Sequence, residues 1–246
     1  MPLSSRLCTM NRIITALLAV SLSIPMAHAG VFSVSPVRIY MKPRDRAVAV
    51  SLVNEGDTEV ALQADVNAWQ QAPDGSDELT LTDDIVLAPP IIKLAPQARQ
   101  VVRLALLKPA DASRQLTYRL IVREVPGASA PKENTIQIPI SLALSIPVFI
   151  TPPSAQRTVV CDTPSVNASM LKVSCTNTGT AYAQVRELLV RRGSQLLARF
   201  EGGMYILPGG RKSLQMKAES MPSAGAVQME ARYDDGSTQV FNVELP

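Results

Sequence analysis

A long alternation of apolar residues near the middle of the chain constrains the fold more than any other feature. In the stretch "NTIQIPISLALSIPVFI", residues 134–150, every even-numbered position from 136 to 148 is Ile, Leu or Val, and the residues between them are mostly Gln, Ser, Pro and Ala. Successive side chains of a strand point to opposite faces, so this pattern predicts a β-strand with one continuous aliphatic face. A typical strand has only about 5–6 residues. Part of this row is therefore expected to face something other than its own domain's core.

The chain after residue 30 consists of short alternating runs separated by turn residues. Runs such as "AVAVSLVN", "QVVRLALL" and "TQVFNVEL" are separated by clusters such as "NEGD", "NTGT" and "LPGG". Many short strands with regular turn signals predict an all-β fold made of sandwiches. No helical period persists long enough to compete with this prediction.

The length predicts two domains, because the part after residue 29 is about 217 residues long and one β-sandwich domain usually has about 100. The break is expected in "FITPPSAQR", where Pro152 and Pro153 lack the N–H donors that a ladder needs. We therefore predict an N-terminal domain at residues 30–151 and a C-terminal domain at residues 152–246.

The first 29 residues have the pattern of a secretory signal peptide. Arg12 precedes the apolar run "IITALLAVSLSI", and "AHAG" has the small residues of a cleavage site, which predicts cleavage after Ala29. Either Met1 or Met10 could be the start. The apolar run is too short for a membrane-spanning helix of about 20 residues. The sequence therefore predicts an exported and soluble mature protein.

Charge and cysteine content agree with export. Two of the 24 basic residues precede residue 30, so the mature chain carries 22 basic and 21 acidic residues. A near-neutral chain lacks the basic surface that binds nucleic acid or an anionic membrane. Cys161 and Cys175 remain in the mature chain, and in an exported protein they are expected to form a disulfide.

The absence of histidine argues against most catalytic and metal chemistry. His28, in the predicted signal peptide, is the only histidine. A mature chain without histidine cannot form Ser-His-Asp or Cys-His catalytic sites or histidine-liganded metal sites. The glycine-rich phosphate-binding motifs are also missing. The acidic pairs in "LTDDIV" and "RYDDGS" lie beside turn residues, which favours solvated loops over acid–base catalysis. We expect neither an enzyme nor a cofactor.

The alternating stretch is predicted to end the first domain, at or near the edge of a sheet. It carries no charge between Glu133 and Arg157. Exposed apolar edges promote aggregation, and proteins usually protect them with charges or bulges. The edge is therefore either covered within this protein or built to pair with another chain by β-augmentation.

Several motifs resemble the PapD-like periplasmic chaperones of chaperone–usher pilus assembly. They are "VSPVRIYMKPRDRAVAVSLVNEG", "APPIIKLAPQARQVVRLAL", "YRLIVREVP" followed by "NTIQIPISLALSIPVF", and, more weakly, "MEARYDDG". The resemblance covers nearly the whole mature chain and implies two immunoglobulin-like domains in an L-shaped arrangement. The short "SPVRI" and "YRL" elements are similar to the archaic branch of the family.

This resemblance implies donor-strand complementation in the periplasm. The chaperone's last strand of domain 1 fills the gap in an incomplete pilin subunit, which is then delivered to an outer-membrane usher. No cofactor, nucleic acid or small-molecule substrate is implied. The side chains expected to enter the subunit are Ile136, Ile138, Ile140, Leu142, Leu144 and Ile146.

The family also holds the subunit's C-terminal carboxylate with basic side chains between the domains. Arg38 matches the family's arginine in "SPVRIY". Ser145 or Pro147 stands where the family commonly has a lysine, so we expect Arg119 to replace it. A structural ion pair is the alternative role for each arginine. Arginine suits a carboxylate because its planar fork binds both oxygens.

Further matches concern the contact between the domains and the usher. Acidic positions that the family links across the domains correspond to Glu124 and to Asp234 or Asp235, and Arg123 lies beside Glu124. Phe149 or Ile150 replaces the arginine that completes this bridge elsewhere, so the bridge must differ here. Pro96 matches a proline near the usher-binding surface, and a turn proline is its alternative role.

A secreted adhesive or structural two-domain sandwich is the rival prediction. Adhesive surfaces tend to present Trp and Tyr, whereas Trp69 is the only Trp in the chain. An exposed aliphatic edge also makes self-association of the free protein plausible.

Overall fold

The computed structural model describes residues 32–125, 141–167, 169–219 and 223–246. The predicted signal peptide and the expected donor residues Ile136, Ile138 and Ile140 lie outside these ranges. No helix that could cross a membrane is found in the described part of the chain.

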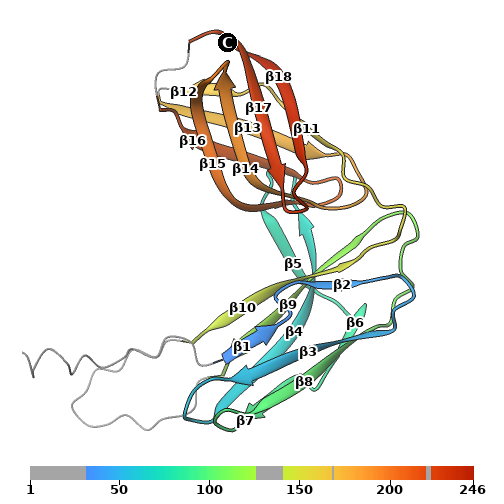
Figure 1. Cartoon of the computed structure of the whole chain (residues 1–246). Coiled ribbons are helices and arrows are strands. Elements are labelled where there is room, and N and C mark those ends of the chain that lie inside the picture. Colours follow the sequence, from blue (N-terminus) through green and yellow to red (C-terminus); the bar gives the residue numbers. More distant parts are fainter. Residues whose placement is uncertain (1–31, 126–140, 168, 220–222) are drawn as a thin grey trace, which may run out of the picture.

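The first sandwich is formed by strands within residues 32–150, in the lower half of Figure 1. One sheet has the order β1 (Phe32–Ser35), β3 (Ala47–Asn54), β8 (Arg99–Leu106) and β6 (Ile85–Ala88). The other has the order β2 (Ile39–Met41), β10 (Ala143–Ile150), β9 (Leu116–Glu124), β4 (Val60–Gln71) and β5 (Asp77–Leu81), and β7 (Ile91–Leu94) also pairs with β4. The alternation of buried and exposed residues along these strands places a single aliphatic core between the sheets.

The second sandwich is formed by strands within residues 159–245, in the upper half of Figure 1. One sheet joins β11 (Val159–Cys161), β13 (Met170–Asn177), β12 (Ser165–Asn167) and β16 (Arg211–Lys217). The other has the order β15 (Gln195–Ile206), β14 (Ala183–Arg192), β17 (Gly225–Tyr233) and β18 (Thr238–Leu245). A disulfide joins Cys161 on β11 to Cys175 on β13, which confirms the predicted pairing.

The all-β prediction is confirmed, and most predicted runs are strands. The run "VFSVSPVRIY" differs from the prediction, because it forms two strands in different sheets: β1 pairs with β3, and β2 pairs with β10. The chain therefore crosses from one sheet to the other between Ser35 and Ile39. The domain boundary at residues 151 and 152 stays a prediction, although β10 ends at Ile150 and β11 begins at Val159.

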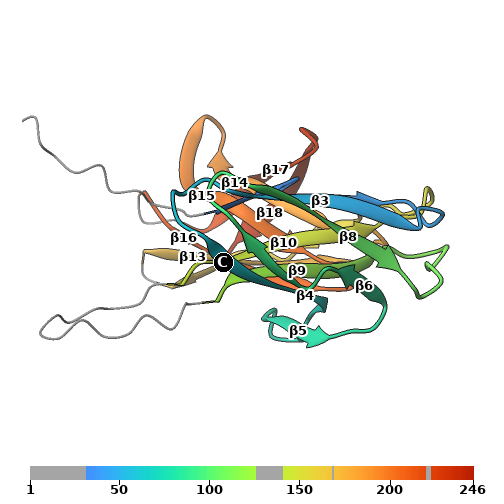
Figure 2. The ribbon, with the colours of Figure 1, turned by 90° about the horizontal axis from the view of Figure 1, so that it is seen from below.

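The two sandwiches meet at an angle, and the hairpin of β4 and β5 extends to the second sandwich (Figure 1). Figure 2 shows β5 at the outer edge of the first sandwich. Asp77 on β5 accepts a hydrogen bond from Lys212 Nζ on β16 at 2.8 Å. Gly75, at the hairpin turn, has a φ of +87°, and a Cβ built there would lie 2.7 Å from the Arg211 carbonyl oxygen. The turn therefore requires glycine for both its conformation and its close approach.

Candidate functional site

Strand β10 is paired differently along its two halves. Val148–Ile150 pairs with β2 on one side and with β9 on the other. Ala143–Pro147 pairs with β9 alone within the described residues. The backbone groups on the outer side of this half therefore form an open sheet edge in the described structure, as the sequence analysis anticipated for a strand near the sheet edge.

The aliphatic row of β10 begins in the core of the first sandwich. Ile146, Val148 and Ile150 are 4%, 0% and 1% exposed and belong to this core, whereas Leu142 and Leu144 are half-buried and pack against it. Ile146 was expected to insert into the core of a partner subunit, but in this structure its side chain is buried in the core of its own domain. Among the described members of the expected donor set, only Leu142 and Leu144 retain exposed surface, and the set as a whole stays a prediction.

Arg119 lies on the opposite face of the same sheet, which faces the second sandwich. Its cross-strand neighbours on that face are Pro147 on β10 and Asn67 on β4. The guanidinium carbon lies 3.7 Å from the ring centroid of Trp69 and 5.5 Å from that of Tyr205. These are cation–π distances.

Arg119 forms no ion pair with any described residue. Burial lowers the pKa of Arg119, although the nearby Tyr205 and Asp77 oppose this shift. Among the described residues, its Nη1 has a hydrogen-bond partner only in the carbonyl oxygen of Ser145, at 3.5 Å. The side chain is thus a partly desolvated cation held on aromatic rings, and an anionic ligand would compensate its charge.

Arg38, just before β2, contacts the second sandwich through hydrogen bonds and an ion pair. Its Nη1 lies 2.6 Å from Asp234 Oδ2, and its Nη2 donates to Gln184 Oε1 at 2.6 Å. Its guanidinium carbon is 5.7 Å from the ring centroid of Tyr205. The two arginines singled out in the sequence therefore approach the same tyrosine ring.

The acidic residues proposed to bridge the domains have different roles in the structure. Asp234 forms the interdomain ion pair with Arg38, whereas Asp235 pairs with Arg157, with 3.1 Å between Nη1 and Oδ2. Arg123 instead pairs with Asp65 on the neighbouring strand β4, with 3.3 Å between Nη1 and Oδ2. Glu124 forms no ion pair within the described residues. The side chain of Asp234 is only 10% exposed, which corrects the prediction of a solvated loop there.

An aromatic cluster fills the place of the missing ionic bridge, a feature that the sequence analysis missed. Phe149 is fully buried and stacks on Tyr182 of the second sandwich, with ring centroids 4.1 Å apart. Trp69 and Leu207 are buried in the same cluster, and Tyr205 packs against it. Phe149 had been noticed only as a replacement for arginine, because no local pattern identifies its partner 33 positions away.

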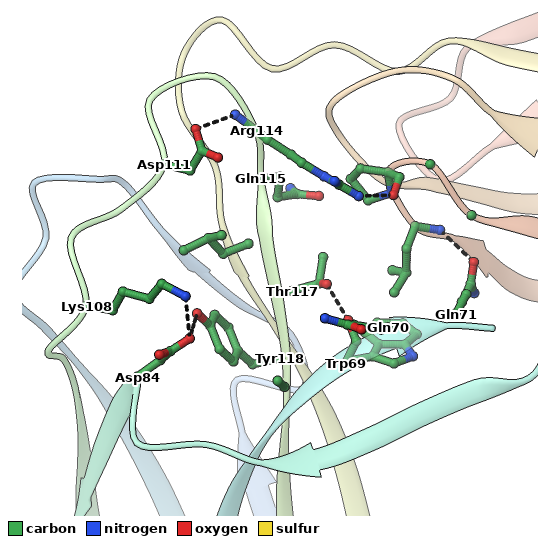
Figure 3. A pocket seen from close by; sticks show the side chains of 16 residues that line it. Trp69, Gln70, Gln71, Asp84, Lys108, Asp111, Arg114, Gln115, Thr117 and Tyr118 are labelled. Carbon is green, nitrogen blue, oxygen red and sulfur yellow. Dashed lines mark hydrogen bonds and ion pairs between the residues drawn. The ribbon is translucent and has the colours of Figure 1, made fainter.

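A pocket of about 450 Å³ lies beside this cluster, between the two sandwiches (Figure 3). Arg114 reaches across it and donates a hydrogen bond to the Pro208 carbonyl oxygen. Gln71 donates from Nε2 to the Tyr205 carbonyl oxygen at 2.9 Å and accepts from the Leu207 N–H at 3.0 Å. These hydrogen bonds connect the sandwiches, so we assign the pocket's polar residues a structural role.

Pro96 lies in the exposed turn between β7 and β8. The Ala98 N–H donates to the Ala95 carbonyl oxygen at 3.1 Å, and Gln97 has a φ of +59°, which together define a type II turn with proline at its second position. This geometry accounts for Pro96 as a turn residue, and contact with an usher stays a prediction.

The described residues contain no group of three or more His, Cys, Asp or Glu side chains that could hold a metal ion. The arrangement instead combines an open strand edge, an aliphatic row and two arginines near the same Tyr205 ring. It suits a protein or peptide ligand that has a free strand and a negative charge.

Solved structures show the same fold at low sequence identity. A chain of the CsuC–CsuE chaperone–tip adhesion subunit pre-assembly complex, from archaic chaperone–usher Csu pili of Acinetobacter baumannii, has 17% identity and a TM-score of 0.64. The match covers 88% of this chain and all of that one. The Escherichia coli chaperone DraB has 19% identity and a TM-score of 0.54, with 87% and 96% of the two chains covered.

A third similar structure is the Salmonella enterica SafA pilin in complex with the SafB chaperone. It has 16% identity and a TM-score of 0.56, and the match covers 89% of this chain and 98% of that one. At these identities the three structures support the fold alone. No curated protein sequence matches the chain.

The sequence itself matches a known family over residues 31–156, just over half of the chain. The matched family is described as "Pili and flagellar-assembly chaperone, PapD N-terminal domain". The match includes every strand of the first sandwich, both candidate arginines and the whole of β10. The chain therefore belongs to the PapD-like family of pilus and flagellar assembly chaperones.

Proposed function

We propose that this protein is a periplasmic chaperone that binds incomplete pilin subunits by donor-strand complementation and delivers them to an outer-membrane usher. The described half-strand Ala143–Pro147, with its open edge, carries the proposal. Its family comprises assembly chaperones rather than enzymes, in agreement with the sequence-based expectation. Export and cleavage after Ala29 are part of this proposal and are supported by the signal-peptide pattern of the first 29 residues.

The aliphatic row supplies side chains for the subunit's core. Even-numbered positions 136–144 continue the face that buries Ile146, Val148 and Ile150 at home, so the same face would pass from one core into another. Burying an aliphatic side chain contributes about 1.5–3 kcal/mol. Five such side chains contribute on the order of 10 kcal/mol before ordering and association costs are subtracted.

The two arginines provide an anchor for the subunit's C-terminal carboxylate. Arg119 is partly desolvated and forms no ion pair with a described residue, while Arg38 lies near the same Tyr205 ring. With Asp234 paired to Arg38, the two guanidiniums retain one positive charge in excess. One carboxylate would neutralise it.

Three further roles belong to this proposal. We place the chain in the archaic branch because its short "SPVRI" and "YRL" elements are similar to that branch. We assign Pro96 to the usher-binding surface because it is exposed. We also propose that the open edge of β10 mediates self-association when no subunit is bound.

The test is affinity capture from a periplasmic extract of pilus-producing cells with tagged residues 30–246, followed by mass spectrometry. We expect one small secreted subunit at one-to-one stoichiometry, lost in Ile140→Asp because a carboxylate cannot enter an apolar core. Ser141→Asp is the matched control, since it places the same charge on the other face of the strand. Loss in both variants, or in neither, would contradict insertion of the even-numbered face.

A further inference from the structure

The second sandwich holds the guanidinium of Arg38 in a fixed orientation. Asp234 Oδ2 lies 2.6 Å from Nη1, and Gln184 Oε1 lies 2.6 Å from Nη2. Nη1 also lies 3.0 Å from the Tyr40 hydroxyl. Arg38 itself belongs to the first sandwich, so the residues that orient it come largely from the other one.

Both acceptors on the second sandwich are themselves held in place. Asp234 Oδ2 accepts a second hydrogen bond from the Tyr182 hydroxyl at 2.9 Å. Gln184 is 4% exposed, and its Nε2 donates to the Gly203 carbonyl oxygen at 3.0 Å. Because the amide nitrogen is engaged there, the amide oxygen faces Arg38. The contact is therefore a set of positioned acceptors rather than a mobile surface ion pair.

The guanidinium of Arg38 has more N–H donors than partners among the described residues. Arginine has five N–H donors, and the contacts to described residues involve Nη1 and one hydrogen bond from Nη2. Nε–H and the second Nη2–H have no partner in the described part of the chain. With Gln184 on the Nη2–H that points toward Nη1, Nε–H and the remaining Nη2–H lie on the same side of the planar group and match the two oxygens of a carboxylate.

We propose that Asp234 and Gln184 are positioning residues that direct the Nε–Nη2 edge of Arg38 toward the C-terminal carboxylate of a bound subunit. This inference rests on the proposed function and extends it. The second sandwich thereby contributes to recognition of the carboxylate, although β10 and both arginines belong to the first. Asp234 contacts Nη1, so the carboxylate can bind beside it without displacing it.

The experiment compares two synthetic peptides that contain the last 15 or so residues of the captured subunit, one with a free carboxylate and one with a C-terminal amide. Their affinities for residues 30–246 are measured by calorimetry. We expect wild type to prefer the acid about tenfold or more, which is the size of a charge-assisted hydrogen bond. In Asp234→Asn this preference should fall at least about fivefold.

The ratio of the two affinities separates positioning from a structural role. A variant that only disturbs packing should weaken the binding of both peptides equally, so the ratio of the two affinities should not change. Asp235→Asn is the matched control, because it removes the same charge at the next residue and breaks the contact with Arg157 instead. Gln184→Met removes the acceptor of the Arg38 Nη2–H and should also lower the ratio of the two affinities. If Asp234→Asn does not fold, Gln184→Met serves as the test variant instead.

An unchanged ratio in Asp234→Asn and Gln184→Met would overturn the inference, as would an equal loss in Asp235→Asn. Tighter binding of the acid by Asp234→Asn would also overturn it, because Asp234 would then compete with the subunit for Arg38. A wild-type protein that binds both peptides equally would instead contradict carboxylate anchoring, which belongs to the proposed function.

Discussion

In both sandwiches a buried asparagine at the end of a central strand hydrogen-bonds to backbone groups of neighbouring segments. Asn54 at the end of β3 and Asn177 at the end of β13 are both 0% exposed. Each donates from Nδ2 to backbone carbonyl oxygens of two other segments, among them Leu94 in the first sandwich and Ile206 in the second. Each also accepts a hydrogen bond from the N–H of the glycine two residues later. Repetition of this local structure shows that the two units are built alike.

Their peripheral strands differ. In the second sandwich a disulfide joins β11 to β13, and the last strand, β18, pairs along its length with β17. In the first sandwich the last strand, β10, also pairs along its length with one neighbour, β9, but it carries an aliphatic row that runs from the core to Leu144 and Leu142. Within the described residues the outer edge is open along both β18 and Ala143–Pro147 of β10, so the aliphatic row is what distinguishes the two strands. The proposed function therefore places subunit binding in the first sandwich, while the contacts of Arg38 with Asp234 and Gln184 involve the second.

Val148→Asp should have the largest effect on this comparison. Val148 is 0% exposed in the first core, and burying an unpaired carboxylate there should remove more than about 4 kcal/mol of stability. Urea denaturation followed by the fluorescence of Trp69, the only tryptophan, measures the change. Ile140→Asp should leave the same transition unaltered. A folded Val148→Asp protein would mean that β10 is not part of the first core.

Removal of the disulfide should affect the second sandwich alone. Cys161 and Cys175 are 14 positions apart, so the double change to Ser should cost about 3 kcal/mol on the chain-entropy model. Calorimetry of both proteins should show a lower melting temperature for the second unit. An equal shift of both units would show that the sandwiches unfold together.

Replacement of the two buried asparagines tests whether they stabilise the two sandwiches to the same extent. Asn54→Ala and Asn177→Ala each leave buried backbone groups without partners, which should cost about 2 kcal/mol. Asn242→Ala, an exposed position on β18, is the control and should stay within about 0.5 kcal/mol of wild type. The free energy of unfolding is measured by urea denaturation. If only one of the two Asn→Ala variants lowered it, the two asparagines would not have equivalent roles.

The smallest effect is expected at the contact between Asp77 and Lys212. Partial burial alone would raise the pKa of Asp77, but hydrogen bonds from Lys212 and Gln71 hold it below its ordinary value. The carboxylate therefore stabilises the folded state above its unfolded pKa of about 3.9, and this contribution is lost as the pH falls through the folded pKa.

Solvent screening limits this contribution to less than about 1 kcal/mol, since the Asp77 side chain is 41% exposed. Thermal unfolding of wild type and Asp77→Asn should differ slightly at pH 7 and converge below pH 4. A difference in melting temperature that grew as the pH fell would contradict a stabilising role for the ion pair between Asp77 and Lys212.

Local patterns predicted the strands that alternate regularly, and "AVAVSLVN" coincides with β3. Strand β15 was missed because Gly202 and Gly203 interrupt its pattern. The "NEGD" and "NTGT" clusters were interpreted only as turns, and their local pattern does not show that Asn54 and Asn177 are buried. Propensity describes neighbours along the chain, whereas these asparagines bond to distant segments.

The site residues were predictable only in part. Arg38 and Arg119 were identified from the family resemblance, and both approach Tyr205. The stacking of Phe149 on Tyr182 depends on how the sandwiches dock, so no single strand carries a signal for it. Ile146 belongs to the same aliphatic row as Leu144. Only tertiary packing distinguishes a side chain buried in its own domain from one that keeps exposed surface.

Hydrogen–deuterium exchange of free and subunit-bound protein tests the central claim most directly. If a subunit strand pairs with β10, backbone amides within residues 134–147 should become protected, while those of β13 and β18 should exchange at unchanged rates. Bound protein with no added protection in residues 134–147, or with protection confined to the second sandwich, would contradict donor-strand complementation by this protein.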